Sequence, residues 1–260
     1  AVDDINRTWL TGFPDVVFTT TDVLVDGDEY AWIVTATGTD TGGFMGLPPT
    51  GKFFELPMVL LCVLRDGQIV DERRIYDFTG MLVQVGILSA KANPAIAARV
   101  RAASPPVDVV VGHTSPATLS PPRAEILALL EARHAAFARY DVQALADQHA
   151  EHCVMDSHLA GRIDGRAAIA DVYRAWFRAF PDSVLKAERA IVDGNRVAEM
   201  VIQSGTDTGG FLGTSPTGKP FRLPTVWLMT VDEGRFSYMR PLYDFTALLV
   251  QIGVLRAKPA

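Results

Sequence analysis

The chain has 260 residues, 48% of them apolar, so it is long enough for one large domain or two of ordinary size and has ample material for a core. A formal net charge of −6 argues against nucleic acid or an anionic membrane as a partner. Two cysteines, Cys62 and Cys153, imply neither a disulfide framework nor a zinc site, and without a spanning segment or signal pattern we expect a cytoplasmic protein.

The loop from Gly46 to Lys52 has the spacing G-x-x-x-x-G-K, which is most of a phosphate-binding loop. That loop requires Ser or Thr after the Lys to hold magnesium, and it requires a helix to follow. Here Phe53 follows, at the start of an apolar run without helical period. We therefore interpret the loop as a hairpin connection rather than a nucleotide site.

The same loop returns later in the chain, as part of a long repeat. A shift of 167 residues lays Ala1 on Ala168 and continues without a gap to Lys91 on Lys258, with about half of the positions identical. The shared segments include FPD, VDG, GTDTGGF, PTGK, YDFT and LVQxGxL. A unit of this length indicates duplication of a whole domain rather than a solenoid. We expect a first repeat over 1–90, an Ala- and Pro-rich linker over 91–121, and a second repeat over 122–260.

The two copies are unequal, because residues 121–167 have no counterpart ahead of Ala1. This segment predicts helix in AEILALLEARHAAFARYDVQALADQHAEH and a short strand in CVMDSHL. The first copy therefore lacks an N-terminal helix and a strand. Three explanations stay open: the elements lie upstream, they have been lost, or the linker replaces them through NPAIAARVRAAS and VDVVVG.

Within the second copy, apolar spacing predicts one or two helices over 122–150 and another over 165–180, ended by Pro181. Hairpin signals then separate four expected strands, over 184–192, 197–204, 221–231 and 235–243. The segment TALLVQIGVL predicts a closing helix. Helices followed by an antiparallel meander predict an α+β fold, in which helices and a curved sheet enclose a conical hollow.

The end of the last strand carries the main chemical candidates. Simple alternation places Arg240 and Asp244 on one face, together with Phe236, Tyr238 and Leu242, unless Pro241 introduces a bulge. In the first copy Arg73 and Asp77 repeat this spacing, which would make a second site.

Two readings of the aspartates stay open. A desolvated carboxylate has a raised pKa that suits general base chemistry near neutral pH, although a nearby Arg opposes that shift. Alternatively, Asp244 and Asp77 act as N-caps of the helices that follow them.

The remaining candidates are histidines and aromatic residues. All the histidines lie outside the duplicated region: His113, His134, His149, His152 and His158. His158 is the one expected to line the hollow, with a structural hydrogen-bonding role as its alternative. A second group consists of aromatic residues that would either fill the core or bind a flat organic ligand: Tyr173, Trp176, Phe180, Phe211, Trp227 and Tyr243.

AFPD after a helix, the VDGN hairpin, GTDTGGFLGTSPTGKPF and an Asp before ALLVQIGVL together resemble the SnoaL-like polyketide cyclases, which belong to the nuclear-transport-factor-two-like superfamily. The resemblance covers nearly all of 122–255 and, in shorter form, 1–88. It implies two cone-shaped α+β domains paired within one chain, with pairing of two chains also open. Many relatives carry His in GTHTG, where this chain has Asp40 and Asp207.

The resemblance also implies acid–base chemistry without a metal or organic cofactor. In these cyclases one Asp before the last helix acts as acid and base in an intramolecular aldol ring closure, and its position matches Asp244. Arg240 and His158 would stabilise the enolate oxygen. The substrate would be a hydrophobic, carbonyl-rich small molecule. Two alternatives stay open: epoxide opening in the same hollow, and a binding or assembly module without chemistry.

Overall fold

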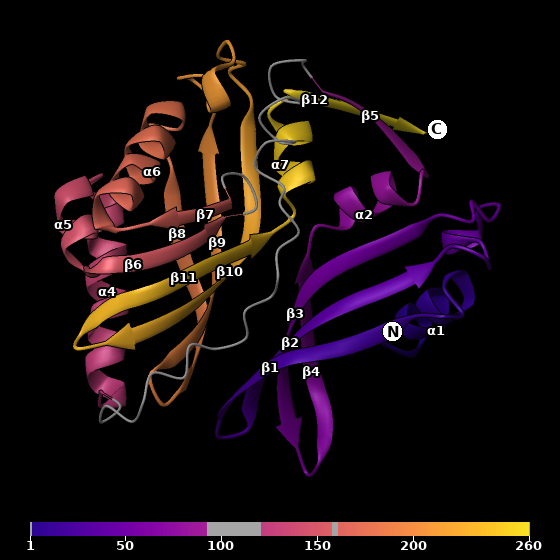
Figure 1. The fold of residues 1–260 in the computed structure, drawn as a ribbon, viewed down its shortest axis with the longest axis horizontal. Helices are drawn as coiled ribbons and strands as arrows, with labels where there is room; N and C mark the ends of the chain where they lie inside the picture. Colours follow the sequence, from indigo (N-terminus) through magenta and orange to yellow (C-terminus); the bar gives the residue numbers. More distant parts are fainter. Residues whose placement is uncertain (1, 93–120, 158–160, 260) are drawn as a thin grey trace.

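The computed structural model describes residues 2–92, 121–157 and 161–259, and these form two halves that lie side by side (Figure 1). The duplication predicted from the sequence is confirmed, since the halves repeat the same order of helix, meander and short helix. The linker segments suggested as a replacement wall lie within 93–120, outside the described residues.

The second half contains four α-helices and a six-stranded sheet of order β7-β6-β11-β10-β9-β8. Its elements are α4 (Arg123–Ala138), α5 (Val142–Asp147), β6 (His149–Ser157), β7 (Gly161–Asp164), α6 (Arg166–Ala179), β8 (Val184–Asp193), β9 (Arg196–Thr206), η2 (Phe211–Gly213), β10 (Pro220–Asp232), β11 (Arg235–Tyr243), α7 (Phe245–Gln251) and β12 (Leu255–Pro259). Strands β8 to β11 form the predicted antiparallel meander, and β6 lies parallel to β11 at its edge.

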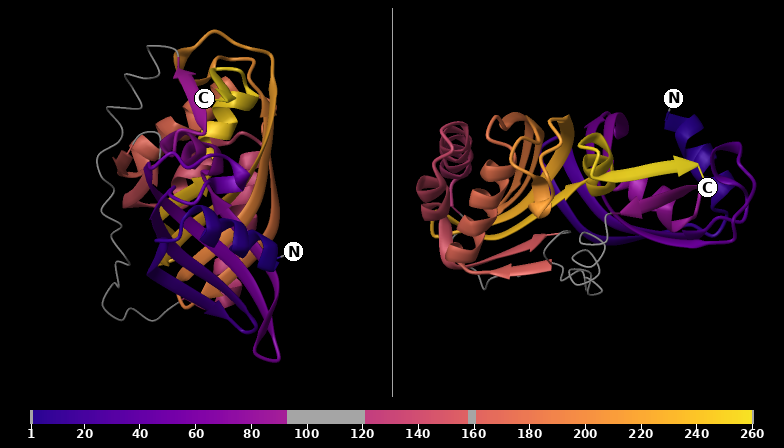
Figure 2. Two further views of the ribbon diagram at one scale, coloured as in Figure 1. Left: turned by 90° about the vertical axis from the view of Figure 1, so that its right-hand side faces the viewer. Right: turned by 90° about the horizontal axis from the view of Figure 1, so that it is seen from above.

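Helices α4, α5 and α6 cover the concave face of this sheet (Figures 1 and 2). Helix α6 buries the apolar stripe predicted for it, including Tyr173 and Phe177, against strands β6, β9, β10 and β11. Inward-facing Val201, Trp227 and Met239 complete this core. The curved sheet and the helices together form the cone expected from the sequence.

The first half contains α1 (Val2–Gly12), β1 (Val17–Asp26), β2 (Glu29–Thr39), η1 (Phe44–Gly46), β3 (Phe53–Arg65), β4 (Gln68–Tyr76), α2 (Phe78–Gln84) and β5 (Leu88–Ala92). Its four-stranded sheet has the order β1-β2-β3-β4. Helix α1 corresponds to α6, and its Trp9 packs among Phe13, Phe44 and Phe54 at one end of the sheet. Among the described residues this half has no counterpart of α4, α5, β6 or β7, so its concave face is covered only in part.

The two sheets pack through their convex faces. A shared core joins Ile33 and Leu61 of the first half to Met200, Ile202 and Leu242 of the second. Strands β5 and β12 pair antiparallel across the top of the two halves (Figure 1). The packing has the form of a dimer built into one chain.

Contacts across this seam are reciprocal, as expected for a pseudo-twofold arrangement. The Val25 amide donates to Asp193 at 3.2 Å, and the equivalent Val192 amide donates to Asp26 at 3.0 Å. Thr79 Oγ1 donates to Asp244 at 2.9 Å, and the equivalent Thr246 Oγ1 donates to Asp77 at 3.0 Å. Each of these four hydrogen bonds thus has a counterpart shifted by one repeat.

The end of the chain differs from the sequence-based prediction. The closing helix was expected to continue through Leu255, but α7 ends at Gln251 and Leu255 begins β12. The change occurs at Gly253, whose φ of 75° is left-handed and unfavourable for most other residues. Pairing with β5 then satisfies the backbone of this last segment.

Candidate active site

The cone of the second half encloses a chamber with a volume of about 700 Å³. Its walls come from α6, from the inner faces of β6, β9, β10 and β11, and from the loop 209–213. Apolar atoms supply most of the lining, and the aromatic members are Phe137, Tyr173, Trp176, Phe211, Trp227 and Tyr243. A hollow of this size and character is typical of a small-molecule site.

The structure brings together five of the six aromatic residues considered as ligand contacts: Tyr173, Trp176, Phe211, Trp227 and Tyr243. The sixth, Phe180, is fully buried behind them and packs against Trp176 and Phe211, with ring centroids 4.7 and 5.0 Å apart. Whether the five contact a ligand stays a prediction.

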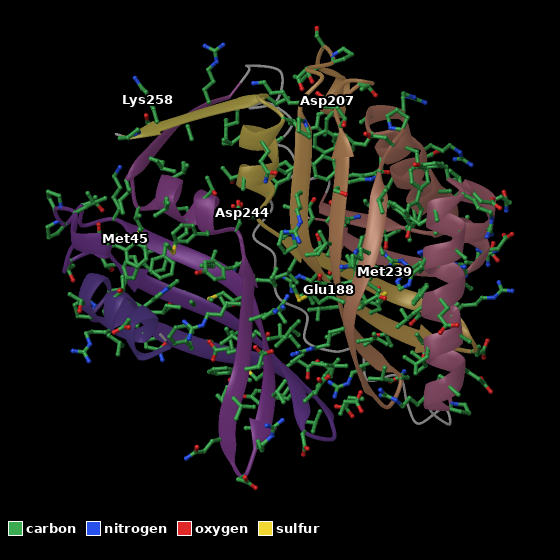
Figure 3. All side chains as sticks on the ribbon, turned by 180° about the vertical axis from the view of Figure 1, so that it is seen from behind. Met45, Glu188, Asp207, Met239, Asp244 and Lys258 are labelled. Carbon is green, nitrogen blue, oxygen red and sulfur yellow. The ribbon has the colours of Figure 1, made fainter. Side chains whose placement is uncertain are left out.

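A buried aspartate shapes the loop at the chamber mouth. Asp207 Oδ1 accepts the amides of Gly210 and Phe211, both at 3.0 Å, while its Oδ2 accepts the Thr217 amide at 3.2 Å and hydroxyl at 2.9 Å. The hydrogen bond from its amide to Asp207 holds Phe211 in position in the chamber wall. Asp207 lies at the end of β9, near the top of the second half in Figure 3.

Asp40 makes the same four contacts in the first half, with Gly43, Phe44 and Thr50. The loop that resembles a phosphate site is thus organised around a carboxylate of the chain itself. The amides of Gly43, Phe44 and Thr50 already donate to Asp40, which agrees with interpreting the loop as a connection between strands rather than a nucleotide site. Sequence reasoning noted both aspartates only as replacements for histidine and did not assign them this role.

Gln203 is the amide side chain in the chamber lining. It lies on the concave face of β9 and is only 6% exposed. Its Oε1 accepts a hydrogen bond from Thr225 Oγ1 at 3.2 Å. Since no hydrogen bond from its Nε2 to another described residue is found, the amide NH₂ is available to a ligand oxygen.

Three further polar atoms belong to residues of the chamber wall. The hydroxyl of Tyr173 and the indole nitrogens of Trp176 and Trp227 are buried without a hydrogen-bond partner among the described residues. Burial raises the pKa of Tyr173, and the charge of nearby Arg133 partly offsets this. The phenol therefore keeps its proton at neutral pH and stays a donor.

Beneath the chamber lies a buried charge cluster of Arg133, His134 and Glu199. Arg133 Nη1 donates to Glu199 Oε2 at 2.9 Å, and His134 Nε2 lies 2.6 Å from Glu199 Oε1. The Arg133 guanidinium also lies 4.5 Å from the ring centre of Trp227, a cation–π contact. The cluster fixes Trp227 from below. It was missed from the sequence because its members come from α4 and β9, far apart in the chain.

Neither His149 nor His152 lines the chamber. His149 is buried, with Nδ1 2.7 Å from the Leu145 carbonyl, and burial lowers its pKa to about 4. His152 is exposed. His158 and His113 lie outside the described residues. The role predicted for His158 therefore stays a prediction.

Asp244 and Arg240 do not line this chamber. Simple alternation holds for Tyr238, Arg240 and Leu242, but a bulge at Ser237 places Phe236 on the opposite face, so the shared face is the one away from the chamber. Phe236 packs in the core of the cone, whereas Leu242 faces the first half. Arg240 shares the face of Leu242 and lines a separate pocket of about 160 Å³ between the halves.

Asp244 lies at the seam (Figure 3). Its Oδ1 caps α7 by accepting the Ala247 amide at 2.7 Å. Its Oδ2 accepts the amide and the hydroxyl of Thr79 at 3.0 and 2.9 Å. The N-cap alternative is therefore confirmed as a structural role, and the carboxylate additionally ties the two halves together.

Asp77 does the same for α2, accepting the Gly80 amide at 2.7 Å and the Thr246 hydroxyl at 3.0 Å. Burial and the neighbouring Asp244 carboxylate raise the pKa of Asp77 to about 7. Arg73, by contrast, is half exposed and pairs with Glu188 at 2.9 Å. The second site proposed for Asp77 and Arg73 thus lies at the seam rather than inside a cone.

The class of this protein is defined by a cone-shaped α+β domain, which occurs once in full and once in shortened form. The full copy encloses an apolar chamber. The family model described as SnoaL-like polyketide cyclase matches residues 1–85 and 128–252. The chain belongs to this family, as the resemblance in the sequence indicated.

Solved structures similar to one half include a protein from a Jannaschia species described as a SnoaL-like polyketide cyclase, at 21% identity and a TM-score of 0.48, covering 52% of this chain and 96% of that one. TsrD from Streptomyces laurentii is 21% identical with a TM-score of 0.47, covering 52% and 98%. IdmH from Streptomyces antibioticus, described as a polyketide cyclase, is 23% identical with a TM-score of 0.43, covering 49% and 97%. No curated protein sequence gives a significant match.

The described residues contain neither a cluster of metal-binding side chains nor a membrane-spanning helix. No cluster of three or more His, Cys, Asp or Glu side chains with metal-binding geometry occurs among them. No helix in the described part of the chain has the length and apolar character needed to cross a bilayer.

Proposed function

We propose that the second half binds a flat, largely apolar, carbonyl-bearing small molecule in its chamber and promotes a cyclase-type reaction on it, an aldol-type ring closure or an isomerisation. The observation that carries this proposal is the chamber of about 700 Å³, walled by aromatic side chains, in a chain of the SnoaL-like polyketide cyclase family. Aromatic walls favour a planar ligand, since ring faces stack in offset or edge-on arrangements.

In this proposal Gln203 holds a carbonyl oxygen of the ligand. Its Oε1 is engaged by Thr225, so its NH₂ is the part that can donate. A donor in an apolar chamber stabilises an oxygen that gains negative charge as the neighbouring carbon loses a proton.

The aromatic walls would restrict a flexible ligand to folded conformations that bring the reacting carbons together. Holding two reacting groups in contact is a large contribution to ring closure, because the entropy of bringing them together is lost on binding. The reaction itself is intramolecular. A C–H proton passes to solvent water, one C–C bond forms as the π bond of the carbonyl breaks, and the new alkoxide takes a proton back from water, so no net proton is gained or lost.

The acid–base role that the sequence predicts for Asp244 is a separate proposal. It requires the carboxylate to act while accepting hydrogen bonds from Thr79 and Ala247, on the side of the sheet away from the chamber. We favour chemistry in the chamber, with Asp244 as a structural residue. Substitution of Asp244 tests the two views against each other.

The test uses an anthraquinone as a binding probe and a linear aromatic poly-ketone as a substrate probe. Calorimetry should show anthraquinone binding that weakens about two- to tenfold in Gln203→Ala, as loss of one hydrogen bond predicts. That variant copies the first half, which has Ala36 at the equivalent position. Absence of anthraquinone binding would refute the site, and equal affinity in both proteins would refute the role of Gln203.

Product analysis in ¹⁸O-labelled water separates the reaction classes. Ring closure forms a C–C bond and adds no oxygen from water to the product. Opening of an epoxide by water forms a new C–O bond, so the product gains one ¹⁸O atom. Binding of the probe with no acceleration of ring closure in any such precursor would favour the alternative of a ligand-binding module.

A further inference from the structure

The pocket of about 160 Å³ at the seam is formed by both halves and lies apart from the chamber. The first half contributes Leu56 and Asp77 among others, and the second half contributes Arg240 and Leu242. Leu56 and Leu242 are almost fully buried, at 2% and 1% exposure. A liquid water molecule occupies about 30 Å³, so the pocket has room for more than water alone.

Arg240 is the unusual member of this pocket. It is 6% exposed, and within the described residues it makes neither an ion pair within 4.0 Å nor a hydrogen bond, although its charge acts on the neighbouring Tyr238. A buried charge without a partner is strongly unfavourable. The pocket beside it is therefore where a counterion would be stabilised.

The duplication explains how this cation came to lack a partner. The equivalent residue Arg73 pairs with Glu188 of the other half at 2.9 Å. Figure 3 shows Glu188 beside the seam. The position equivalent to Glu188 in the first half is Thr21. The hydroxyl of Thr21 donates to the Ile33 carbonyl at 3.0 Å and carries no charge. The second copy has kept the arginine, but the first copy has no carboxylate at the position equivalent to Glu188.

We propose that this seam pocket binds a small monocarboxylate anion, with the Arg240 guanidinium on the carboxylate and a short aliphatic tail against Leu56 and Leu242. The planar guanidinium matches a carboxylate through two parallel hydrogen bonds. At the rim, Gln84 Oε1 accepts the Glu55 amide at 3.1 Å, which leaves its NH₂ as a second donor.

The charges around the pocket favour a monoanion over a dianion. Facing it are Asp77, with Asp244 behind it, Glu55 at the exposed rim, and Tyr243, whose phenol is kept neutral because burial raises its pKa. Asp77, with its pKa near 7, is protonated in mildly acidic solution and then adds no charge. The Arg240 cation thus lies near two carboxylates, Asp244 behind Asp77 and Glu55 at the rim, and this acidic surround disfavours a dianion more strongly than a monoanion.

The experiment measures binding of propionate and of sulfate to the whole chain at pH 6 by calorimetry. We expect propionate to bind at least ten times more tightly than sulfate. Arg240→Gln should weaken propionate binding at least tenfold. The matched control is Arg73→Gln, which removes the equivalent but exposed and paired arginine and should leave propionate binding unchanged.

A second variant keeps the arginine in place. Thr21→Glu supplies the carboxylate that Glu188 supplies to Arg73, so it should pair with Arg240 and also weaken propionate binding at least tenfold. Failure of the unmodified protein to bind propionate would overturn the proposal. So would equal binding by Arg240→Gln or Thr21→Glu, and sulfate binding as tight as propionate would overturn the ligand class. None of these outcomes depends on the chamber of the second half.

Discussion

Replacement of Asp77 by Asn should flatten the dependence of stability on pH. In the folded protein, burial and the neighbouring Asp244 raise the pKa of Asp77 from 3.8 to about 7. A raised carboxyl pKa means that the folded state holds a proton that the unfolded state releases. Stability is therefore full below pH 4 and is lost as the pH rises towards and through 7.

The magnitude follows from the two pKa values. A tenfold difference in proton affinity is worth about 1.4 kcal/mol, so the difference between 3.8 and about 7 corresponds to about 4 kcal/mol in total. Between pH 5 and pH 8, about 2 to 3 kcal/mol of this should be lost from the free energy of unfolding. Asn caps a helix as well as Asp does, so the hydrogen bond to Gly80 is retained in the variant.

The assay is urea unfolding at several pH values between 5 and 8, with the unmodified protein beside two variants. Asp77→Asn should lose most of the decline. Asp141→Asn is the matched control, because Asp141 caps α5 through the Ala144 amide in the same way, at 3.0 Å. It should decline like the unmodified protein. An Asp77→Asn variant that declines just as steeply would refute the assignment of this proton to Asp77.

Three further predictions concern buried acidic residues. Asp244→Asn should weaken the tie between the halves but leave anthraquinone binding and turnover in place; abolished turnover in a folded variant would instead support the catalytic role predicted from the sequence. Glu199→Gln leaves Arg133 buried without a charged partner and should lower the free energy of unfolding by about 3 kcal/mol, measured by urea unfolding, whereas a loss below about 1 kcal/mol would contradict this account of the cluster. Asp207→Ala should release the chamber loop and weaken anthraquinone binding, while Asp40→Ala, which releases the same loop in the first half, should lower stability alone; equal effects on binding would contradict the placement of the site.

Much of the fold could be predicted because the signals were local or repeated. The helical spacing of α6 and the hairpin signals around Gly194 and Gly234 act within a few residues, and both glycines have the left-handed φ that such turns require. The duplication supported the assignment of the meander strands and of the short closing helix, because each of these patterns occurs in both copies. The bulge at Ser237 has no such local signal, and it places Phe236 on the opposite face from Arg240, although both were assigned to the same face.

The candidate site was predicted only in part, since its aromatic residues follow from helix and strand phase but its polar ones do not. Gln203 and Glu199 flank or interrupt the apolar run of β9 from Val197 to Ile202, and their partners come from other elements. A usable signal did exist in the repeat. The first copy has Ala36 and Trp32 at these two positions, and such differences mark where the complete cone departs from the shortened one.

The central claim is that the second half, and not the first, holds the functional chamber, and tryptophan fluorescence tests it directly. Trp176 and Trp227 line the chamber, whereas Trp9 and Trp32 belong to the first half. A bound anthraquinone should quench a protein carrying Trp9→Phe and Trp32→Phe almost as strongly as the unmodified chain, and should scarcely quench one carrying Trp176→Phe and Trp227→Phe. The reverse pattern, or quenching shared evenly between the two proteins, would contradict the account.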